Sequence, residues 1–252
     1  MQQRTVKRYG WKPSLPDPRD RKFKIYRPVP LPEEVDLRDE CTPVYDQESL
    51  GSCTGNAIGG AYEFGLKKQE KPVFTPSRLY IYYNERWIAG TVDQDSGAYI
   101  RDGLKSLNKQ GVCDELMWPY LIRKFKEKPS DECYEEGLKH TISDYERIDN
   151  RSLFLLKQCL AKGIPFVFGF SVFEGFESEE VARTGVVNMP TPGESMVGGH
   201  AVLAVGYDDK TKRFIVRNSW GEEWGQKGYF TIPFEYLTNP ELADDFWAIW
   251  SV

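Results

Sequence analysis

The chain has 252 residues and a formal net charge of −5, with 40% hydrophobic and 28% charged residues. This is the composition of an ordinary globular protein. No apolar run approaches the roughly 18 residues needed to cross a bilayer. The first ten residues carry charge with no apolar stretch after them, unlike a secretory signal.

The positive charge is concentrated at the N-terminus. Residues 1–30 contain nine Lys or Arg against two Asp, a net +7, which leaves −12 for residues 31–252. A basic tail can bind nucleic acid or an anionic membrane, but this one lacks amphipathic periodicity, and its prolines argue against a long helix. We therefore expect residues 1–30, called the leader below, to be extended and docked on the acidic body of the same chain, with no nucleic-acid or membrane partner.

The first half of the body reads as helical. Ile58, Tyr62 and Leu66 recur at four-residue steps, the stripe of a buried helix over residues 55–68. Cys53 then falls at or just before the N-terminus of this helix, where the helix dipole and free N–H groups lower the pKa of a thiol. Further helices are predicted over residues 75–84 and 100–109.

The second half predicts strands, over residues 166–172, 201–207, 214–218 and 228–233. The fold class is thus α+β, with a domain over 31–252 that has a helical lobe at about 40–140 and an antiparallel β lobe at about 141–252. An active site between the lobes is the natural geometry, because the nucleophile and the base lie in different halves.

Four residues carry the candidate chemistry. Cys53 is a nucleophile candidate with Gln47 six residues before it, and an amide side chain can donate to an oxyanion. His200 follows two glycines, and Asn218 precedes Ser-Trp-Gly. Taken singly, each could have a structural role without catalysis: a buried cysteine, a core histidine, a turn-forming asparagine or a solvated loop amide. Together they provide nucleophile, base, orienting group and oxyanion donor.

The cysteines do not indicate a metal or a disulfide framework. They are odd in number and have no CxxC spacing, and the chain has two histidines, so we expect no metal and no cofactor. Mostly reduced, buried cysteines are the expected state for Cys41, Cys113, Cys133 and Cys159.

These motifs resemble the papain-like cysteine peptidases over about residues 31–232. Gln47 matches that family's oxyanion glutamine, Cys53 its nucleophile, His200 its catalytic histidine and Asn218 the orienting asparagine, with Trp220 over the Asn–His hydrogen bond. The resemblance implies a two-lobed papain-like fold with a barrel-like β lobe. It also implies a hydrolase that cleaves peptide bonds in protein or peptide substrates through an acyl-enzyme.

The resemblance also implies substrate-binding positions. The loop that pairs with substrate backbone matches Ser96, Gly97 and Ala98, while Gly169 and Gly199 match the pocket for the second residue before the scissile bond, with Trp220 alongside. Small residues at that pocket predict a roomy, apolar cavity. Glu194 is interpreted as an exposed loop charge, and contact with a basic substrate residue is the alternative interpretation.

The departures from the family pattern are informative. Leu50 replaces the first Cys of Cys-Gly-Ser-Cys-Trp, Thr54 replaces the Trp, and the loop 93–98 lacks the partner Cys. An absent bridge fits a reducing compartment. These features resemble the signal-less bacterial, archaeal and viral branch, so a cytoplasmic or virion-associated protein is expected.

The leader suggests a zymogen. It is short compared with the prosegments of secreted relatives, and we expect it to lie along the cleft as an inhibitory segment, removed near Val29–Leu31. Two other functions remain open at this point. One is acyl transfer of the transglutaminase or peptide-ligase type on the same triad; the other is a non-catalytic papain-like binding module.

Overall fold

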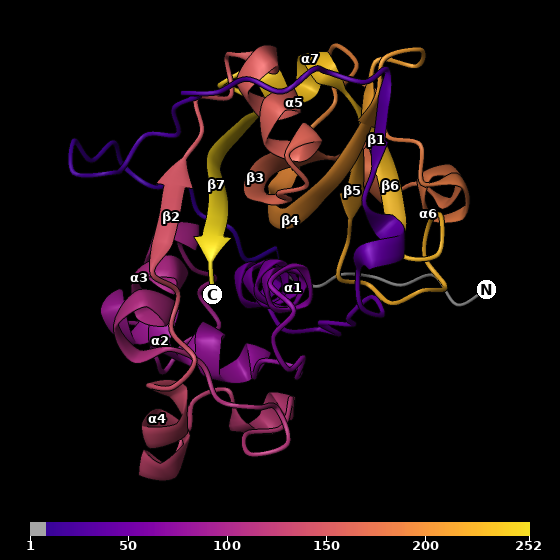
Figure 1. Cartoon of the computed structure of the whole chain (residues 1–252). Helices are drawn as coiled ribbons and strands as arrows, with labels where there is room; N and C mark the ends of the chain where they lie inside the picture. Colours follow the sequence, from indigo (N-terminus) through magenta and orange to yellow (C-terminus); the bar gives the residue numbers. More distant parts are fainter. Residues whose placement is uncertain (1–8) are drawn as a thin grey trace.

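The computed structural model describes residues 9–252, with helices gathered in the first half of the chain and a sheet built by the second half (Figure 1). The α-helices are α1 (Cys53–Lys68), α2 (Arg78–Ile88), α3 (Ile100–Gln110), α4 (Asp131–Gly137), α5 (Leu153–Ala161), α6 (Glu179–Thr184) and α7 (Phe234–Thr238). The strands are β1 (Glu34–Asp36), β2 (Asp144–Arg147), β3 (Phe166–Phe173), β4 (Met196–Asp208), β5 (Arg213–Arg217), β6 (Tyr229–Pro233) and β7 (Ala243–Ser251). Short 3₁₀ turns complete the chain: η1 (Arg38–Glu40), η2 (Ile122–Lys124) and η3 (Glu174–Glu177).

The sheet is antiparallel and runs in the order β2-β7-β3-β4-β5-β6, with β1 paired to β4. Its register places Phe170 of β3 opposite His200 of β4. The candidate base therefore sits on a buried strand that has neighbours on both sides, which fixes its position.

Helix α1 lies between the other helices and the sheet, where Figure 1 shows it nearly end on. Its predicted stripe of Ile58, Tyr62 and Leu66 is confirmed as fully buried, and most other residues of the helix are buried as well. A helix covered on both sides is rigid, so Cys53, its first residue, is held in place at the junction of helices and sheet.

Three strands of the sheet, β1, β2 and β7, were not predicted from the sequence. Strand β7 begins with Ala243-Asp244-Asp245, and two carboxylates in a row break the apolar alternation that marks a strand. Asp245 also adopts a left-handed backbone conformation with φ 58°, and its side chain is fully buried. Within residues 9–252, no helix is both long enough and apolar enough to span a membrane.

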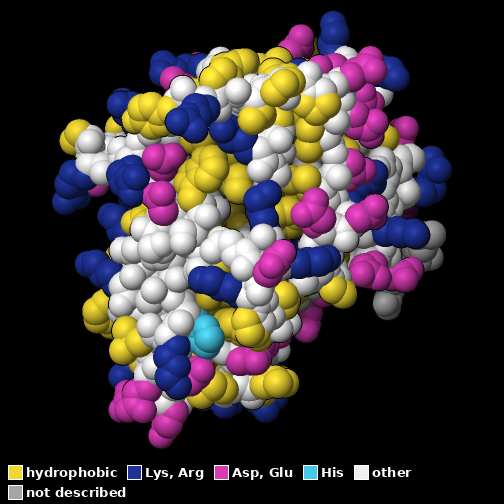
Figure 2. All heavy atoms as spheres, in the orientation of Figure 1, with side chains coloured by type: hydrophobic (Ala, Val, Ile, Leu, Met, Phe, Trp, Pro, Cys, Tyr) yellow, Lys and Arg dark blue, Asp and Glu magenta, His cyan; other side chains and the backbone are white. Residues whose placement is uncertain are grey.

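The described part of the leader is extended, and contains no helix between residues 9 and 30. Its basic character contributes at the surface, where Arg21 pairs with Asp144 at 2.7 Å. In the buried ion pair between the described leader and the body, the leader supplies the acid. Asp20 binds Arg101 of α3 at 2.6 Å, with both side chains 9% exposed. Figure 2 shows acidic and basic side chains interspersed over one face of the body.

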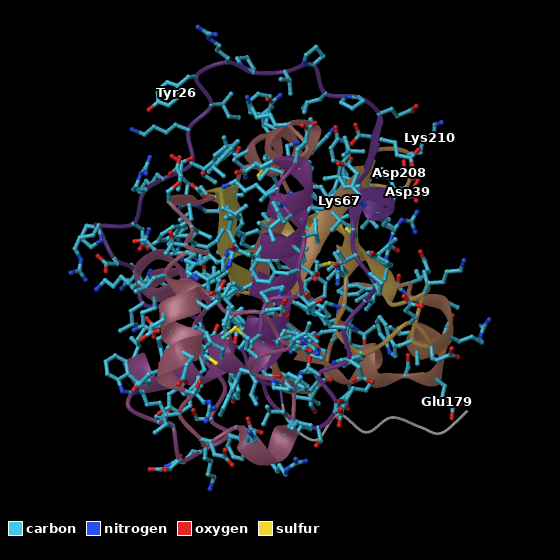
Figure 3. All side chains as sticks on the ribbon, turned by 60° about the horizontal axis from the view of Figure 1, so that its bottom comes forward. Tyr26, Asp39, Lys67, Glu179, Asp208 and Lys210 are labelled. Carbon is cyan, nitrogen blue, oxygen red and sulfur yellow. The ribbon has the colours of Figure 1, made fainter. Side chains whose placement is uncertain are left out.

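Not all of the leader is docked. Tyr26 is 85% exposed and points away from the body in Figure 3. Further along, Val29 is tied to Gln158 of α5 through its N–H at 3.0 Å and its carbonyl at 2.6 Å. The leader therefore leaves the body around Tyr26 and returns to it before β1.

Candidate active site

The fold brings the four candidate residues together. The Cys53 thiol accepts the backbone N–H of Ala201 at 3.4 Å, so it lies beside His200 of β4. His200 Nε2 lies 2.7 Å from Asn218 Oδ1, and the loop of Gln47 is joined to the same region by its N–H to the carbonyl of Ser219 at 2.8 Å. All four side chains are at most 2% exposed.

The histidine is oriented by its hydrogen bond. An amide oxygen accepts only, so Nε2 carries the proton and donates it to Asn218. Nδ1 is then the basic nitrogen in the neutral ring, and it is buried with no hydrogen-bond partner among residues 9–252. Trp220 stacks on the imidazole at 5.1 Å between centroids, which shields the His–Asn bond from water.

Gln47 is fixed through both ends of its amide. Its Oε1 accepts the Ser219 hydroxyl at 2.7 Å, and one N–H donates to the carbonyl of Leu50 at 2.8 Å. The amide group has a second N–H. A side chain held in this way is a preorganised donor for a developing oxyanion.

The loops that flank the cysteine are joined by a carboxylate. Asp95 accepts the Gly51 N–H at 3.1 Å and the Tyr82 hydroxyl at 2.5 Å. The loop 93–98 lacks the cysteine of the family pattern and is attached to the Cys53 loop by hydrogen bonds instead. All five cysteines are free.

The leader fills the space in front of these residues. Trp11 donates its N–H to the Gly199 carbonyl at 3.0 Å, Lys12 donates to the Ala98 carbonyl at 3.0 Å, and Ala98 donates to the Gly10 carbonyl at 2.6 Å. This pattern makes Trp11 and Ala98 a parallel bridge. The fit is close, because a Cβ on Gly10 would lie 1.8 Å from the Gly51 carbonyl oxygen.

Trp11 occupies the pocket expected for a substrate side chain. A Cβ on Gly169 would lie 1.9 Å from the indole, and one on Gly199 would lie 2.8 Å from it. The indole Nε1 donates to Asp245 Oδ2 at 3.2 Å. The small residues predicted an apolar pocket, and the structure adds a buried carboxylate to the wall of this space.

The remaining predicted positions are placed differently from one another. Gly97 donates its N–H to the Tyr82 hydroxyl at 3.1 Å, whereas the Ser96 hydroxyl bonds Thr91 at 2.8 Å and makes no hydrogen bond to the described leader. Glu194 accepts from the Thr191 N–H at 2.9 Å and caps its own loop. Sequence reasoning missed Asp245, because its place in the pocket depends on the pairing of β7 with β3.

Burial controls the ionisation of the covered site. It raises the pKa of the Cys53 thiol to about 12, a rise that the Ala201 and Gly10 backbone N–H groups only partly oppose. Burial also lowers the pKa of His200 to about 4, against the opposing effect of the hydrogen bond that His200 donates to Asn218. With the leader in place, the pair is therefore a neutral thiol and a neutral imidazole at pH 7. Within residues 9–252, no group of three or more His, Cys, Asp or Glu is placed to hold a metal ion.

The α+β fold places a cysteine at a helix N-terminus beside a strand-borne histidine, an arrangement that suits thiol-dependent acyl transfer. The model of the papain family cysteine proteases matches residues 31–239. The chain belongs to this family.

Individual relatives agree with that assignment. An uncharacterized peptidase C1-like protein of Acanthamoeba polyphaga mimivirus is 44% identical, with 97% of this chain and 87% of the relative covered. Cathepsin K of Gallus gallus is 30% identical over 80% of this chain, which spans 58% of that relative.

Solved structures give the same fold. Xylellain, a cysteine protease from Xylella fastidiosa, superimposes with a TM-score of 0.89 at 43% identity, covering 100% of this chain and 99% of xylellain. The bromelain protease of Ananas comosus matches with a TM-score of 0.67 at 22% identity, covering 86% of this chain and 97% of bromelain. The papain-like α+β fold predicted from the sequence is confirmed.

Proposed function

We propose that this protein is a cysteine-type endopeptidase that cleaves peptide bonds through an acyl-enzyme. The observation that carries the proposal is the His200 imidazole, which is held by Asn218 at 2.7 Å with its Nδ1 unpartnered within residues 9–252, next to a cysteine at the start of α1. Family membership supports a peptidase.

Each residue then has a chemical role. Nδ1 of His200 takes the thiol proton, and the Cys53 sulfur attacks the scissile carbonyl carbon. The second Gln47 N–H and the Cys53 backbone N–H stabilise the oxyanion. His200 gives the proton to the leaving amine and then activates water, which releases the acyl group from sulfur.

We also propose that the chain is made as a latent zymogen and that the leader holds it latent. Cys53 is fully buried, and its thiol receives the backbone N–H of Gly10 of the leader where a substrate would place a carbonyl carbon. An N–H group offers the sulfur no carbonyl carbon to attack, so the docked leader is not cleaved at Gly10.

The test is labelling of the full chain with an epoxide inhibitor of papain-like enzymes, peptide mapping of the adduct, and hydrolysis of fluorogenic peptides. The covered chain should react slowly, and once the leader is displaced we expect the adduct on Cys53 and hydrolysis that is absent from Cys53→Ala. Cys41→Ala is the matched control, because it removes a free cysteine away from the site. Hydrolysis that persists in Cys53→Ala would refute the mechanism, and product formed on an added amine rather than on water would identify a transferase instead.

A further inference from the structure

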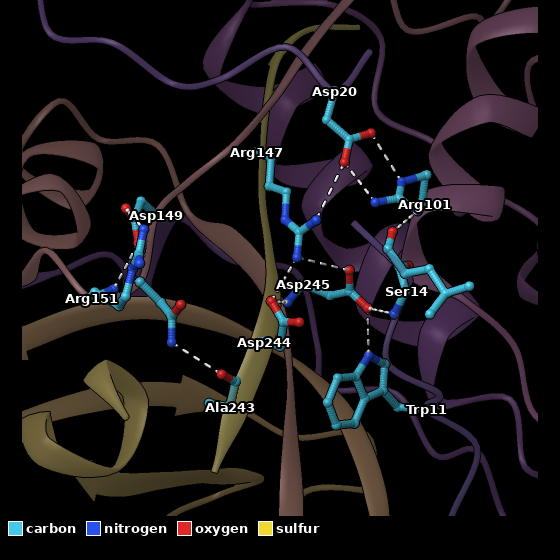
Figure 4. A network of polar contacts seen from close by, with 12 residues as sticks. Trp11, Ser14, Asp20, Arg101, Arg147, Asp149, Arg151, Ala243, Asp244 and Asp245 are labelled. Carbon is cyan, nitrogen blue, oxygen red and sulfur yellow. Dashed lines mark hydrogen bonds and ion pairs between the residues drawn. The ribbon is translucent and has the colours of Figure 1, made fainter. Parts of the chain in front are cut away.

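The pocket filled by Trp11 has a buried acid in its wall. Asp245 is fully buried, and its Oδ2 accepts two hydrogen bonds, from the Trp11 indole at 3.2 Å and from the Ser14 backbone N–H at 2.7 Å. Figure 4 shows both donors converging on the carboxylate. Both belong to the leader, so both are lost when the leader leaves.

The pocket is adjacent to the reacting sulfur. Trp11 is the residue after Gly10, whose N–H reaches the Cys53 thiol, and its own N–H binds the Gly199 carbonyl next to His200. A substrate side chain one residue away from the scissile residue therefore enters the space that the indole now fills. Resting on the proposed peptidase function, we infer that Asp245 makes this pocket select a basic side chain, arginine foremost, at the second residue before the scissile bond.

The charges around Asp245 leave it short of a partner. Arg147 approaches Asp245 Oδ1 only to 3.9 Å, because it makes its short contact with Asp244 Oδ1 at 2.7 Å. Oδ1 of Asp245 has no hydrogen bond within residues 9–252. The guanidinium of Arg147 thus faces Asp244 and Asp245 together with Asp20 of the leader, which it approaches at 3.3 Å. When the leader leaves, Asp245 Oδ2 loses both of its hydrogen-bond donors.

A substrate arginine can donate to the Asp245 carboxylate in place of the leader donors Trp11 and Ser14. Burial raises the pKa of Asp245, so an ionised carboxylate there is costly unless a cation accompanies it. A planar guanidinium presents several N–H donors and can engage both carboxylate oxygens at once. Its aliphatic stem fits beside Gly169 and Gly199, where the indole lies now.

The conformation of Asp245 supplies a matched substitution. Its φ of 58° is one that Asn and Asp tolerate better than other side chains. Asp245→Asn therefore removes the charge without backbone strain. Asp149→Asn is the control, because it removes the same charge from a side chain that is 47% exposed, pairs with Arg151 and makes no hydrogen bond to Trp11, Ser14 or Asp245.

The experiment uses the full chain carrying Gly10→Leu and Trp11→Ala, which empties the cleft because a Cβ at residue 10 collides with Gly51. Loss of protection of the leader against trypsin verifies that it has left. Peptides that differ only in Arg, Leu or Phe at the second position before the scissile bond then compete in one reaction. The rate of epoxide adduct formation on Cys53 is measured alongside.

We expect kcat/KM for Arg to exceed that for Leu by about tenfold or more, as for a hydrogen bond to a charged group. Asp245→Asn is expected to bring the ratio close to one, and Asp149→Asn to leave it unchanged. Cleavage with Leu or Phe preferred, or an Arg preference that survives Asp245→Asn, would overturn the inference while leaving the peptidase intact. Absence of both cleavage and adduct in the opened chain would refute the proposed function itself.

Discussion

Removing the indole of Trp11 should release the latent chain. Trp11 is 8% exposed and donates to a buried carboxylate, so Trp11→Ala removes both apolar burial and a hydrogen bond to a charged group. Truncation of a buried Trp costs about 3–5 kcal/mol. Here the loss falls on docking of the leader rather than on the body.

The size of the effect follows from that cost. At about 1.4 kcal/mol per tenfold, a loss of about 3 kcal/mol raises the ratio of open to covered chains roughly a hundredfold. Only the open form exposes Cys53, so the rate of epoxide labelling should rise by a similar factor while the covered form predominates. The remaining leader contacts, such as Asp20 with Arg101, keep the effect from being larger.

The assay is a time course of adduct formation on Cys53 in the full chain at pH 7. Tyr26→Ala is the matched control, because it removes a large aromatic from the same leader at a position that is 85% exposed and directed outward (Figure 3). Equal labelling rates for wild type, Trp11→Ala and Tyr26→Ala would refute the idea that the pocket contact holds the leader closed.

Two other predictions concern the leader. Asp20→Asn leaves Arg101, 9% exposed, without its ionic partner. Breaking such a buried pair costs about 3–5 kcal/mol, so an added protease should cleave the leader faster. Asp17→Asn is the control, because it breaks an ion pair within the leader and should not change the cleavage rate. Acid should also loosen docking, because burial lowers the pKa of His200 from 6.5 to about 4 and the leader contributes to that burial through Tyr9, whose ring lies 5.9 Å from the imidazole. The contribution of His200 to docking is therefore complete above pH 6.5 and is lost as pH falls toward 4, with a shift toward the open form of at most roughly thirtyfold at pH 5. The rate at which an added protease cleaves the leader, measured against pH in a Cys53→Ala background, reports this shift. His200→Gln should remove the pH dependence of that rate, whereas His140→Gln, which changes the other histidine, should not. An unchanged pH dependence in His200→Gln would contradict the role of His200 in docking.

The parts of the fold that could be predicted are those set by local pattern. The helix over residues 55–68 is marked by a four-residue stripe, and its observed bounds, Cys53–Lys68, differ by two residues at the start. Gln47 and Cys53 share one loop, and Asn218 follows a strand, so short motifs identify them. The structure brings these residues to one place.

The acid in the pocket and the indole that fills it could not be predicted, because they come from distant segments. Asp245 reaches it only through the antiparallel pairing of β7 with β3, where Asp244 lies opposite Gly169. Trp11 reaches it from the other end of the chain. No periodicity in the sequence indicates a contact between residues 11 and 245.

Latency and specificity meet at the same carboxylate. An ionised group buried as fully as Asp245 is costly whenever it lacks a partner, and in the covered chain the leader supplies Trp11 and Ser14 as donors. When the leader leaves, the same oxygen must be satisfied by water or by a substrate, and a guanidinium satisfies it best. Asp245→Asn should therefore change two properties together: weaker docking of the leader and a weaker preference for arginine. Substitutions that loosen the leader from outside the pocket, such as Asp20→Asn, should change the first property alone. That separation follows only if one carboxylate serves both.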